Sequence, residues 1–533
     1  MSKEVAQPEM VEVEDAIQQV NRGVDWELEK DAHEGAIAEH SMAVKQALAA
    51  YWKAVCWSVI ISWAVIMESY DIQIIGSFYA YPTFQQKYCE QVGPNSWQVP
   101  SAWQVGLSVG SNIGIMIGIL LNGYLIEKFG HRRLLLVALC FQAAFIFITF
   151  FAPNIRVLLV GEILCGLPWG VFNTVAPSYA VEVCPLALRG YLTTFVNLCW
   201  VIGHLIAAGV LDGLVNNTTE WSYRIPFAIQ WVWPLPLFIA IAMAPDSPWW
   251  LVRKNRVDDA EKSIRRLATN DQLVNPKDAV ALIVHTTRLE ASLNIGASYA
   301  ACFQGTDLRH TEIACVSWAS QAFVGFAVQS YSTYFFEQAG MPASDAFKLT
   351  LGTFSIAFCG TVSSWFTQTY FGRRTLFLAG TAFMGPLLFV IGFLQLAPVT
   401  DNIRWAQAVI LVIWFGGYGA TIGPIPYVIA AEISSSNLRT KTISVARDMY
   451  YLSNLVNSIV SPYMLNPQNA NLKGKAAFPA ACFNVALFVW AFFRLPESKG
   501  RTFEELDILF AKHVPARKFV GVNEVFNELY VFY

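Results

Sequence analysis

The chain contains one short basic motif twice, GHRRL at residues 130–134 and GRRTL at residues 372–376, and each copy joins two long apolar stretches. Each copy is followed by a glutamate and, seven residues later, by an arginine: Glu182 and Arg189, then Glu432 and Arg439. One short basic match arises easily by chance, whereas two motifs repeated in the same order do not. The sequence therefore indicates two related halves.

The apolar stretches around these motifs are long enough to cross a bilayer, which takes about 20 mostly apolar residues of helix. Twelve stretches qualify, at roughly residues 54–79, 102–126, 134–152, 157–181, 191–211, 225–244, 313–336, 347–367, 375–395, 406–431, 442–465 and 477–494. Backbone groups in lipid must bond within their own segment, so each stretch is predicted to be a helix. We expect an all-α membrane protein with twelve transmembrane helices in two six-helix pseudo-repeats.

Loop charges indicate the orientation. Lys128, Arg132 and Arg133 lie between the second and third stretches, and the long central loop is rich in lysine and arginine. Because basic loops stay on the cytoplasmic side, both termini and the central loop are predicted to be cytoplasmic. The expected divisions are a tail (1–53), a six-helix bundle (54–245), the central loop (246–312), a second six-helix bundle (313–495) and a tail (496–533).

The sequence does not support a nucleic-acid-binding protein or an enzyme. The net charge is −3 and no domain is basic, so no nucleic-acid partner is expected. GLSVG at residues 106–110 matches a hydrolase pattern that needs a strand-to-helix turn. Here it lies in an apolar helix with glycine at every fourth residue as far as Gly118, which favours close helix packing. Neither a cofactor, a metal site nor an enzymatic activity is predicted.

Ionisable residues inside the apolar stretches are the most informative feature. Away from the ends of the stretches they are Glu68, Asp71, Glu162, His204 and the neighbours Arg447 and Asp448. A charge inside a membrane is costly and marks a functional site by default. Three acids with one nearby arginine cannot all stay ionised in a low dielectric, so one is expected to hold a proton in some state. Glu68, Asp71, Glu162 and Arg447 are therefore the predicted proton-coupling site, in preference to a static ion-pair network; His204 is interpreted as an ordinary polar residue.

The basic motif suggests a conformational switch. Arg132 and Arg133 are predicted to reach Glu182 and Glu432 at neighbouring cytoplasmic helix ends. Charge-assisted hydrogen bonds of this kind would hold one conformation and break in the other. The predicted switch residues are Glu127, Arg132, Arg133, Glu182, Arg189, Arg373, Glu432 and Arg439. The alternative is an ordinary basic loop.

Four stretches together resemble the sugar porter family of the major facilitator superfamily. GYLIEKFGHRR at 123–133 is similar to the family's G-x-x-x-D-[RK]-x-G-[RK]-[RK], with Glu127 replacing aspartate and His131 replacing a basic residue. The others are PSYAVEVCPLALRG at 177–190, PDSPWWL at 245–251 and PESKGRT at 496–502. The chain looks most like fungal α-glucoside permeases of the maltose type, on ESYD at 68–71, CGLPWG at 165–170, CPLALR at 184–189, NLCW at 197–200, YSTYF at 331–335 and LKGK at 472–475.

The resemblance implies the major facilitator fold and a secondary active transporter in the plasma membrane. Such a protein takes up α-glucosides such as maltose together with protons, by alternating access. Asp71 corresponds to the aspartate of the family's G-Y-D segment, which makes it the preferred proton carrier. The alternatives are a hexose transporter, a passive sugar facilitator or, less favoured, a sugar sensor that does not transport.

The resemblance also implies sugar contacts between the halves at Asn197, Gln321, Tyr331, Tyr427 and Asn454. Amides offer hydroxyl groups both donors and acceptors, and aromatic rings pack on the C–H faces of sugars. Gln321 keeps the first glutamine of the hexose pattern Q-Q-x-x-G-x-N, but Ala322 and Ala327 replace the second glutamine and the asparagine. A disaccharide is therefore expected in preference to glucose.

Overall fold

Each half of the molecule consists of six helical rods, in agreement with the repeat. A computed structural model describes residues 28, 30–32, 34–35, 38, 42–88, 90–93, 96–269, 274–293, 299–398, 400–434, 438–499, 506, 509–510 and 512–521. The first-half rods are α2 (Val44–Phe78), α4 (Ser101–Phe129), α5 (His131–Phe150), α6 (Ile155–Val183), α7 (Leu186–Leu214), and the series α8 (Trp221–Ile229), η1 (Gln230–Val232) and α9 (Pro234–Met243).

The second half has the same plan, with more interrupted helices. Its rods are the series α13 (Asp307–Phe323), α14 (Phe326–Ser330) and α15 (Ser332–Gln338), then α16 (Ala343–Tyr370), α17 (Arg373–Leu394), the pair α18 (Asp401–Ala420) and α19 (Ile425–Ile433), α20 (Arg439–Leu465) and α21 (Ala477–Arg494). The halves meet where α4 packs against α20 and α7 packs against α16.

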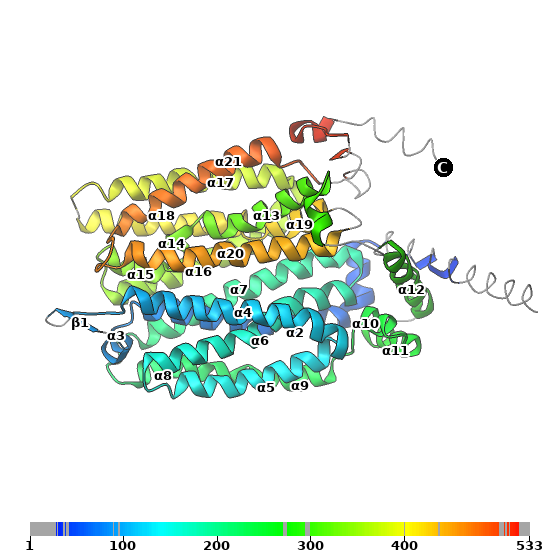
Figure 1. Cartoon of the computed structure of the whole chain (residues 1–533), viewed down its shortest axis with the longest axis horizontal. Helices are drawn as coiled ribbons and strands as arrows, with labels where there is room; N and C mark the ends of the chain where they lie inside the picture. The colour runs from blue at the N-terminus through cyan, green and yellow to red at the C-terminus, as the bar shows by residue number, and fades with distance from the viewer. Residues whose placement is uncertain are drawn as a thin grey trace, which may run out of the picture.

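Shorter elements cap the two ends of the bundle (Figure 1). One end carries α3 (Pro82–Tyr88) and the strands β1 (Glu90–Gly93) and β2 (Ser96–Gln98), which pair antiparallel with Glu90 opposite Gln98. The other end carries the central-loop helices α10 (Pro248–Arg253), α11 (Val257–Leu267) and α12 (Pro276–Leu293) and the turns η2 (Tyr299–Phe303) and η4 (Ala516–Gly521). A further turn, η3 (Lys473–Ala476), precedes α21. We call these two ends the hairpin end and the loop-helix end.

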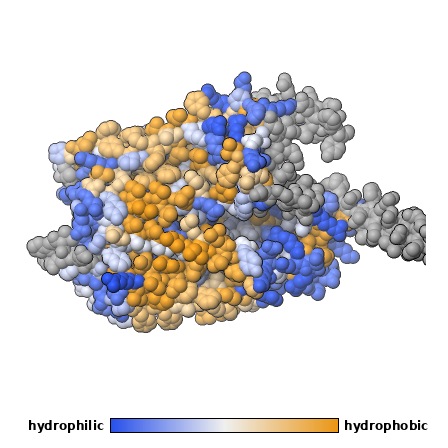
Figure 2. All heavy atoms as spheres, viewed as in Figure 1, coloured by the Kyte–Doolittle hydropathy of each residue, from blue (hydrophilic) through white to orange (hydrophobic). Residues whose placement is uncertain are grey.

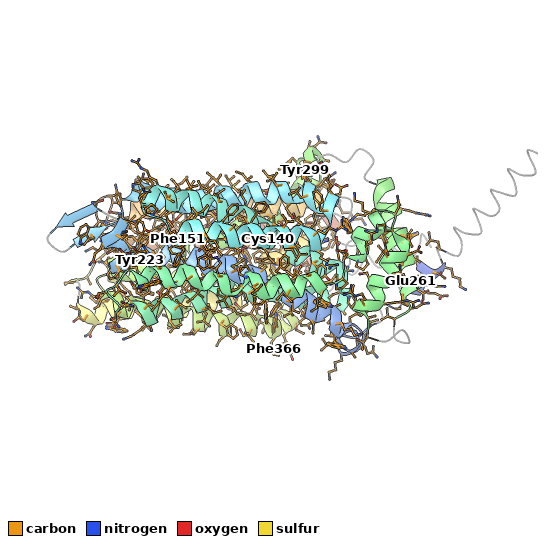
Figure 3. The ribbon with its side chains drawn as sticks, turned by 90° about the horizontal axis from the view of Figure 1, so that it is seen from below. Cys140, Phe151, Tyr223, Glu261, Tyr299 and Phe366 are labelled. Carbon is orange, nitrogen blue, oxygen red and sulfur yellow. The ribbon has the colours of Figure 1, made fainter. Side chains whose placement is uncertain are left out.

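The surface has the pattern of a membrane protein. Figure 2 shows apolar residues over the middle of the bundle and polar residues toward both ends. In the view of Figure 3, Tyr223 and Phe151 lie toward the hairpin end, whereas Glu261 of α11 lies at the loop-helix end. Large apolar side chains such as Leu120 and Phe366 are 72% and 65% exposed. A belt of this kind faces lipid tails.

The prediction of twelve transmembrane helices is met in two ways. Within the described residues, ten helices are long and apolar enough to span a membrane as single segments. The other two crossings are the α13–α15 series, which is broken by Gly325 and Tyr331, and α20, which carries Arg439, Lys441, Arg447 and Asp448. Both fail a simple hydropathy criterion because they contain breaks or charges, and both border the space between the halves.

The first helix begins before the predicted start at residue 54. Helix α2 starts at Val44 and leaves helical geometry once, at Tyr51 (φ −123°, ψ 25°). Its first turns pack on the central-loop helices, where the Thr269 N–H donates to the Ala50 carbonyl at 2.8 Å. Ala50 is buried in a small apolar cluster with Trp250 and Ile264. This packing explains a helical segment that hydropathy alone does not predict.

The regularly spaced glycines of α4 pack against α6, as the sequence indicates. A side chain at Gly114 would collide with the Ile163 carbonyl, and one at Gly118 would collide with the Leu167 carbonyl. Helix backbones in membranes approach this closely only through small residues. The GLSVG stretch therefore lies in a packing helix, and the strand-to-helix turn that a hydrolase nucleophile needs is missing there.

Candidate functional site: a polar cavity between the halves

A cavity of about 190 Å³ lies between the two halves, where helices of the second half face α2, α4, α6 and α7 of the first. Its wall combines amides with aromatic rings. The polar residues include Gln73, Asn112, Asn173, Asn197, His204, Gln321, Gln329 and Asn454, and the large aromatic residues include Trp200, Trp318, Phe354, Phe415, Tyr418, Tyr427, Tyr450 and Tyr451. This mixture of donors, acceptors and ring faces suits a polyhydroxylated ligand.

Four of the five predicted sugar contacts lie on this wall: Asn197, Gln321, Tyr427 and Asn454. The Gln321 amide nitrogen donates to the Gly423 carbonyl, which is free to accept because the backbone is irregular between α18 and α19. The Asn454 amide donates across the halves to Asn112 at 3.0 Å. The Tyr427 ring packs edge-on against Trp318, with centroids 4.4 Å apart.

Tyr331 departs from the prediction, because it is absent from the cavity wall and lies in the layer that closes the cavity toward the hairpin end. Its hydroxyl donates to Ser108 Oγ at 3.0 Å, and Tyr79 bonds the same oxygen at 3.1 Å. The two tyrosine rings stack with centroids 6.0 Å apart. The break in the rod at Tyr331 (φ −124°, ψ 39°) separates α14 from α15 and places this side chain against the first half.

Further contacts between the halves lie at the same end. Asn466 Nδ2 donates to the Val99 carbonyl at 3.0 Å, and Ser101 bonds Asn469. Ser77 Oγ lies 3.1 Å from Thr333 Oγ1. Together with the Tyr331 layer, these hydrogen bonds close the cavity at the hairpin end.

The four predicted proton-coupling residues form two groups instead of one cluster. In the first group, Asp71 and Glu162 lie close together, and Gln230 of η1 donates to Asp71. Both acids are about 1% exposed. Two neighbouring carboxyl groups in a low dielectric disfavour each other's ionisation. This group lies entirely within the first half.

The second group joins Glu68 to Arg447 through a residue that the sequence analysis did not select. Asn173 of α6 donates to Glu68 Oε1 at 3.3 Å and accepts a hydrogen bond from Arg447. The Asn173 amide also donates to the Tyr451 hydroxyl. Asn173 lies eleven residues after Glu162, about three helical turns, so the two share a face of α6. That spacing is the signal by which Asn173 could have been found.

Arg447 lies in an aromatic surround at the cavity wall. Its guanidinium carbon is 4.8 Å from the Trp318 ring centroid and 5.8 Å from those of Tyr427 and Tyr451. Aromatic faces attract cations, more strongly where water is excluded. One residue therefore belongs both to the sugar-type cavity and to the chain of hydrogen bonds that leads to Glu68.

His204, interpreted from sequence as an ordinary polar residue, also lines the cavity. Its Nδ1 is 2.6 Å from the Trp200 carbonyl, and its ring is 5.0 Å from that of Phe354 across the halves. His204 follows Asn197 by seven residues, which places both on one face of α7. The missed signal is this spacing within a single apolar stretch.

At the loop-helix end, the first half holds Glu182 in a network of its own. Arg253 of α10 donates to Glu182 Oε1 at 2.7 Å, and Ser247 donates to Oε2. His131 Nε2 is 3.5 Å from the same carboxylate. The predicted partner Arg132 instead donates to the Ala242 carbonyl at the end of α9. The prediction did not anticipate that α10 folds back over the helix ends and supplies the cation.

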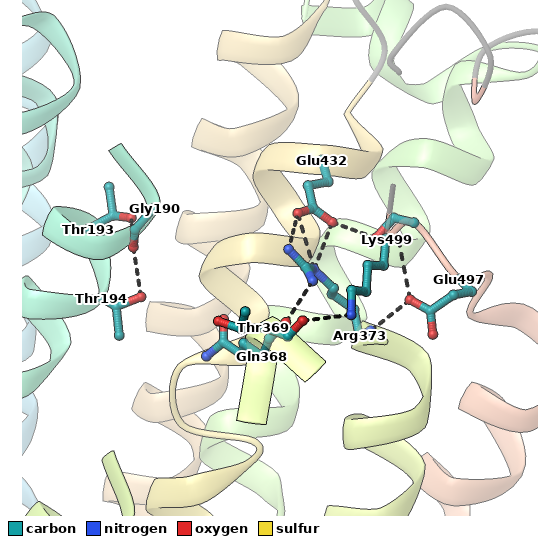
Figure 4. Close-up of polar contacts among 10 residues, drawn as sticks. Gly190, Thr193, Thr194, Gln368, Thr369, Arg373, Glu432, Glu497 and Lys499 are labelled. Carbon is teal, nitrogen blue, oxygen red and sulfur yellow. Dashed lines mark hydrogen bonds and ion pairs between the residues drawn. The ribbon is translucent and has the colours of Figure 1, made fainter. Parts of the chain in front are cut away.

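The second half holds Glu432 in the equivalent way (Figure 4). Arg373 donates to both carboxylate oxygens, at 2.8–3.1 Å, and Ser498 donates at 2.6 Å. Glu497 accepts from the Arg373 backbone at 2.7 Å, and Lys499 donates to the Thr369 and Tyr370 carbonyls. A Cβ at Gly372 would lie against the Glu497 carboxylate, so any larger residue here would require that side chain to shift.

The remaining predicted switch residues lie at the same end. Glu127 is exposed, and its backbone carbonyl accepts from the Trp250 indole at 3.0 Å. Arg189 donates to the Cys184 carbonyl at 3.2 Å. Arg133 is exposed at the start of α5. Arg439 begins α20, and its side chain lies outside the described residues.

Comparisons with known proteins agree with this architecture. The profile of a family described as "Sugar (and other) transporter" matches residues 57–510. The General alpha-glucoside permease of Saccharomyces cerevisiae is 40% identical over 499 residues, which cover 92% of this chain and 80% of that protein. Maltose permease MAL61 of the same organism is 38% identical, with coverage of 92% and 81%.

Solved structures resemble the fold. The partially occluded inward open xylose transporter XylE from E. coli aligns with a TM-score of 0.68 at 20% identity, covering 84% of this chain and 99% of that one. The structure of the proton:xylose symporter XylE bound to 6-bromo-6-deoxy-D-glucose aligns with a TM-score of 0.64 at 21% identity, covering 88% and 100%. The expected fold, two six-helix halves around a central space, is confirmed.

Proposed function

This chain belongs to the sugar transporter family, and from that premise we propose that it takes up α-glucosides such as maltose together with protons, by alternating access. The observation that carries the proposal is the continuous path from Glu68 through Asn173 to Arg447, which joins a buried acid to the wall of the cavity. A passive facilitator has no need of buried acids beside its sugar pocket.

The cavity supports a disaccharide as the substrate. Rings on the wall, among them Trp200 and Trp318, offer stacking faces to two sugar units. The identity to yeast α-glucoside and maltose permeases, 40% and 38%, supports the same substrate class. Asn197, Gln321, Tyr427 and Asn454 are the proposed sugar contacts, with Asn112 and His204 added from the structure.

The buried acids support the proposal that protons move together with the sugar. Asp71 and Glu162 are buried close together, an arrangement that favours a proton on one of them, and Glu68 is fully buried with one oxygen bonded to Asn173. Removing a carboxylate from water is costly unless it is paired or protonated. A change in the contacts of these acids during transport therefore changes whether they hold the proton, which links proton binding to sugar movement.

The two ends of the molecule support alternating access. We assign the loop-helix end to the cytoplasm and the hairpin end to the outside of the plasma membrane, following the excess of basic residues in the central loop. The contacts around Tyr331 and Ser108 then close the outer side. The Glu182 and Glu432 networks each stay within their own half or the adjacent loop helices, which corresponds to a state open toward the cytoplasm.

The decisive experiment is uptake of labelled sugars in cells that lack their own sugar transporters. Maltose is expected to accumulate above its external concentration, and an uncoupler is expected to abolish the gradient. Glucose should compete weakly. Equilibration without accumulation would identify a passive facilitator, and stronger competition by glucose than by any disaccharide would identify a hexose transporter.

A further inference from the structure

We propose that Asn173 is the residue that couples the proton to the movement of the two halves. This inference rests on the proposed proton-coupled transport, and it assigns the link to a single amide. Asn173 is a positioning residue in this role, because the proton is carried by an acid and Asn173 sets what that acid contacts.

Three helices meet at this amide. Asn173 is about 1% exposed in the middle of α6. Its nitrogen donates to Glu68 Oε1 of α2 at 3.3 Å and to the Tyr451 hydroxyl of α20. Its oxygen accepts from Arg447 Nη2, also of α20. Among the described residues, Glu68 and Arg447 form no ion pair of their own, so the contact between acid and base runs through the amide.

Only a side chain that both donates and accepts can hold this arrangement. Glu68 requires a donor and Arg447 requires an acceptor, and a carboxamide supplies both from one planar group. An aspartate would offer acceptors alone, so it would attract Arg447 and repel an ionised Glu68. An apolar residue would leave Glu68 and Arg447 without the hydrogen bonds that the amide supplies, a loss that is greatest for buried charged groups.

The amide connects the two halves differently in the two conformations. In the structure, Arg447 and Tyr451 of the second half bond to Asn173 of the first half. The Asn173 side chain is therefore all that separates the positive charge of Arg447 from Glu68. Both of these bonds depend on the position of the second half, so a movement of the halves changes how close Arg447 lies to Glu68. A carboxylate deep in the membrane without a nearby cation is unfavourable, so Glu68 holds a proton when Arg447 is withdrawn and releases it when Arg447 returns.

The sugar acts on the same amide. Asn173, Arg447 and Tyr451 all line the cavity, so a sugar hydroxyl at this wall competes for the hydrogen bonds that hold Asn173 to the second half. Sugar occupancy and proton occupancy are thereby linked through one group, as reciprocal coupling requires. Asn112 supplies a natural comparison, since it also lines the cavity and bonds across the halves, to Asn454 and Ser458, but it is not bonded to an acid in the described network.

The test uses the full chain in sealed membrane vesicles, with two readouts for each variant. Labelled maltose exchange between the two sides measures sugar binding and the conformational change without net proton movement. Alkalinisation of the medium on sugar addition, divided by sugar uptake, measures protons per sugar. Surface labelling normalises both readouts to the amount of protein.

Asn173→Ala is expected to keep most of the exchange while protons per sugar fall about ten-fold, within the range of site-to-site coupling energies. Asn173→Ser, whose hydroxyl cannot reach both partners, is expected to behave in the same way. It replaces Asn173→Ala in the test if that variant does not reach the membrane. Asn173→Gln, which restores a carboxamide, should regain part of the proton movement. Asn112→Ala should weaken exchange and leave protons per sugar at the wild-type value.

A wild-type stoichiometry in Asn173→Ala or Asn173→Ser would overturn this inference and leave the proposed function intact. An equal loss of exchange and of proton movement would also overturn it, since a merely structural residue would behave that way. If the wild-type protein moves sugar without protons, the proposed function itself fails. Proton movement by the wild-type protein is therefore measured before any variant is tested.

Discussion

Ser247 and Ser498 occupy equivalent positions in the two halves, and each donates a hydrogen bond to the glutamate at the loop-helix end of its own half, Glu182 or Glu432. The two serines belong to the similar stretches PDS at 245–247 and PES at 496–498, which follow the last helix of each half. The repeat therefore extends beyond the helices into a pair of matched hydrogen-bond networks around Glu182 and Glu432, which we call the first lock and the second lock.

The two locks differ in the source of their positive charge. In the second half Arg373, directly after Gly372, pairs with Glu432. In the first half the equivalent residue is His131, and Arg253 of α10 supplies the cation to Glu182. The first lock therefore depends on the central-loop helices, whereas the second depends on the motif itself.

Removing the second lock should change the rate of transport more than sugar affinity. Arg373→Ala eliminates three charge-assisted hydrogen bonds to Glu432, and losses of about 1.5–3 kcal/mol correspond to roughly ten-fold or more in a conformational equilibrium. Initial-rate uptake measurements should show a lower maximal rate with little change in the half-saturating maltose concentration. Arg374→Ala is the matched control, since within the described part of the chain this neighbour donates to the Phe492 carbonyl and not to Glu432. A change confined to affinity would contradict this role.

Weakening the outer closure should expose the cavity to the outside. Tyr331→Phe removes the hydroxyl that donates to Ser108 and keeps the ring that stacks on Tyr79. An impermeant thiol reagent added outside should then label a cysteine introduced at Gln329, on the cavity wall, faster than when Tyr331 is intact. Identical labelling rates would show that this bond does not hold the closure.

Truncating a cavity amide should weaken sugar binding. Gln321→Ala removes a donor and acceptor from the wall, and the loss of one hydrogen bond to a buried partner corresponds to about ten-fold in affinity. Maltose protection or equilibrium binding in membranes measures the change. Gln407→Ala is the control, because this equally buried amide bonds Ile391 and Gln395, which are not on the cavity wall. Equal affinities in the two variants would make Gln321 a packing residue.

Neutralising the neighbouring carboxyl groups of Asp71 and Glu162 should lower accumulation and leave exchange partly intact, with Glu68 still present to carry a proton. Asp71→Asn and Glu162→Gln each replace an acid by an uncharged group that can still hydrogen-bond, so the pair no longer binds and releases a proton. Accumulation ratios with and without an uncoupler, measured for the single and double variants, test this directly. A double variant that still concentrates maltose as strongly as the wild type, in an uncoupler-sensitive way, would place the proton path elsewhere.

The contact between α4 and α6 should be sensitive to added volume at one glycine and insensitive at another. A Cβ at Gly114 meets the Ile163 carbonyl, whereas one at Gly123 of the same helix meets no atom within 4 Å. Overpacking costs about 1–3 kcal/mol, so Gly114→Ala should lower the midpoint of thermal unfolding in detergent. Gly123→Ala should leave it unchanged or slightly higher, because alanine favours helix. A similar midpoint for both variants would argue against this close contact.

The sequence predicts the helices, the two halves and the class of protein well, because hydropathy and the repeated motifs depend on local composition. It predicts contacts between helices poorly. Glu182 was assigned to the wrong arginine because nothing local to either residue indicates that α10 folds back over it. Tyr331 was assigned to the cavity, and the backbone break that turns it toward Ser108 is not visible in the sequence pattern.

Asn173 shows a different limit. A neutral asparagine in an apolar stretch is a weaker sign of function than a charge. Such an amide can also serve only to join neighbouring helices by hydrogen bonds. The importance of Asn173 follows from what α2 and α20 bring to it. Spacing along α6 could suggest that Asn173 and Glu162 share a face, but only the folded chain places Asn173 between an acid and a base of different halves.

Among the described residues, the three acids with about 1% exposure or less, Glu68, Asp71 and Glu162, lie on first-half helices. The irregular helices α13–α15, α18 and α19 and the aromatic surround of Arg447 belong to the second half. The proposed proton carriers thus come from one half, whereas the proposed sugar contacts come from both, with Asn112, Asn197 and His204 in the first half and Gln321, Tyr427 and Asn454 in the second. A mutagenesis library aimed at unusual disaccharides can therefore vary cavity positions in either half while it leaves the three acids unchanged. Arg447 must also be kept, because it bonds to Asn173 across the halves.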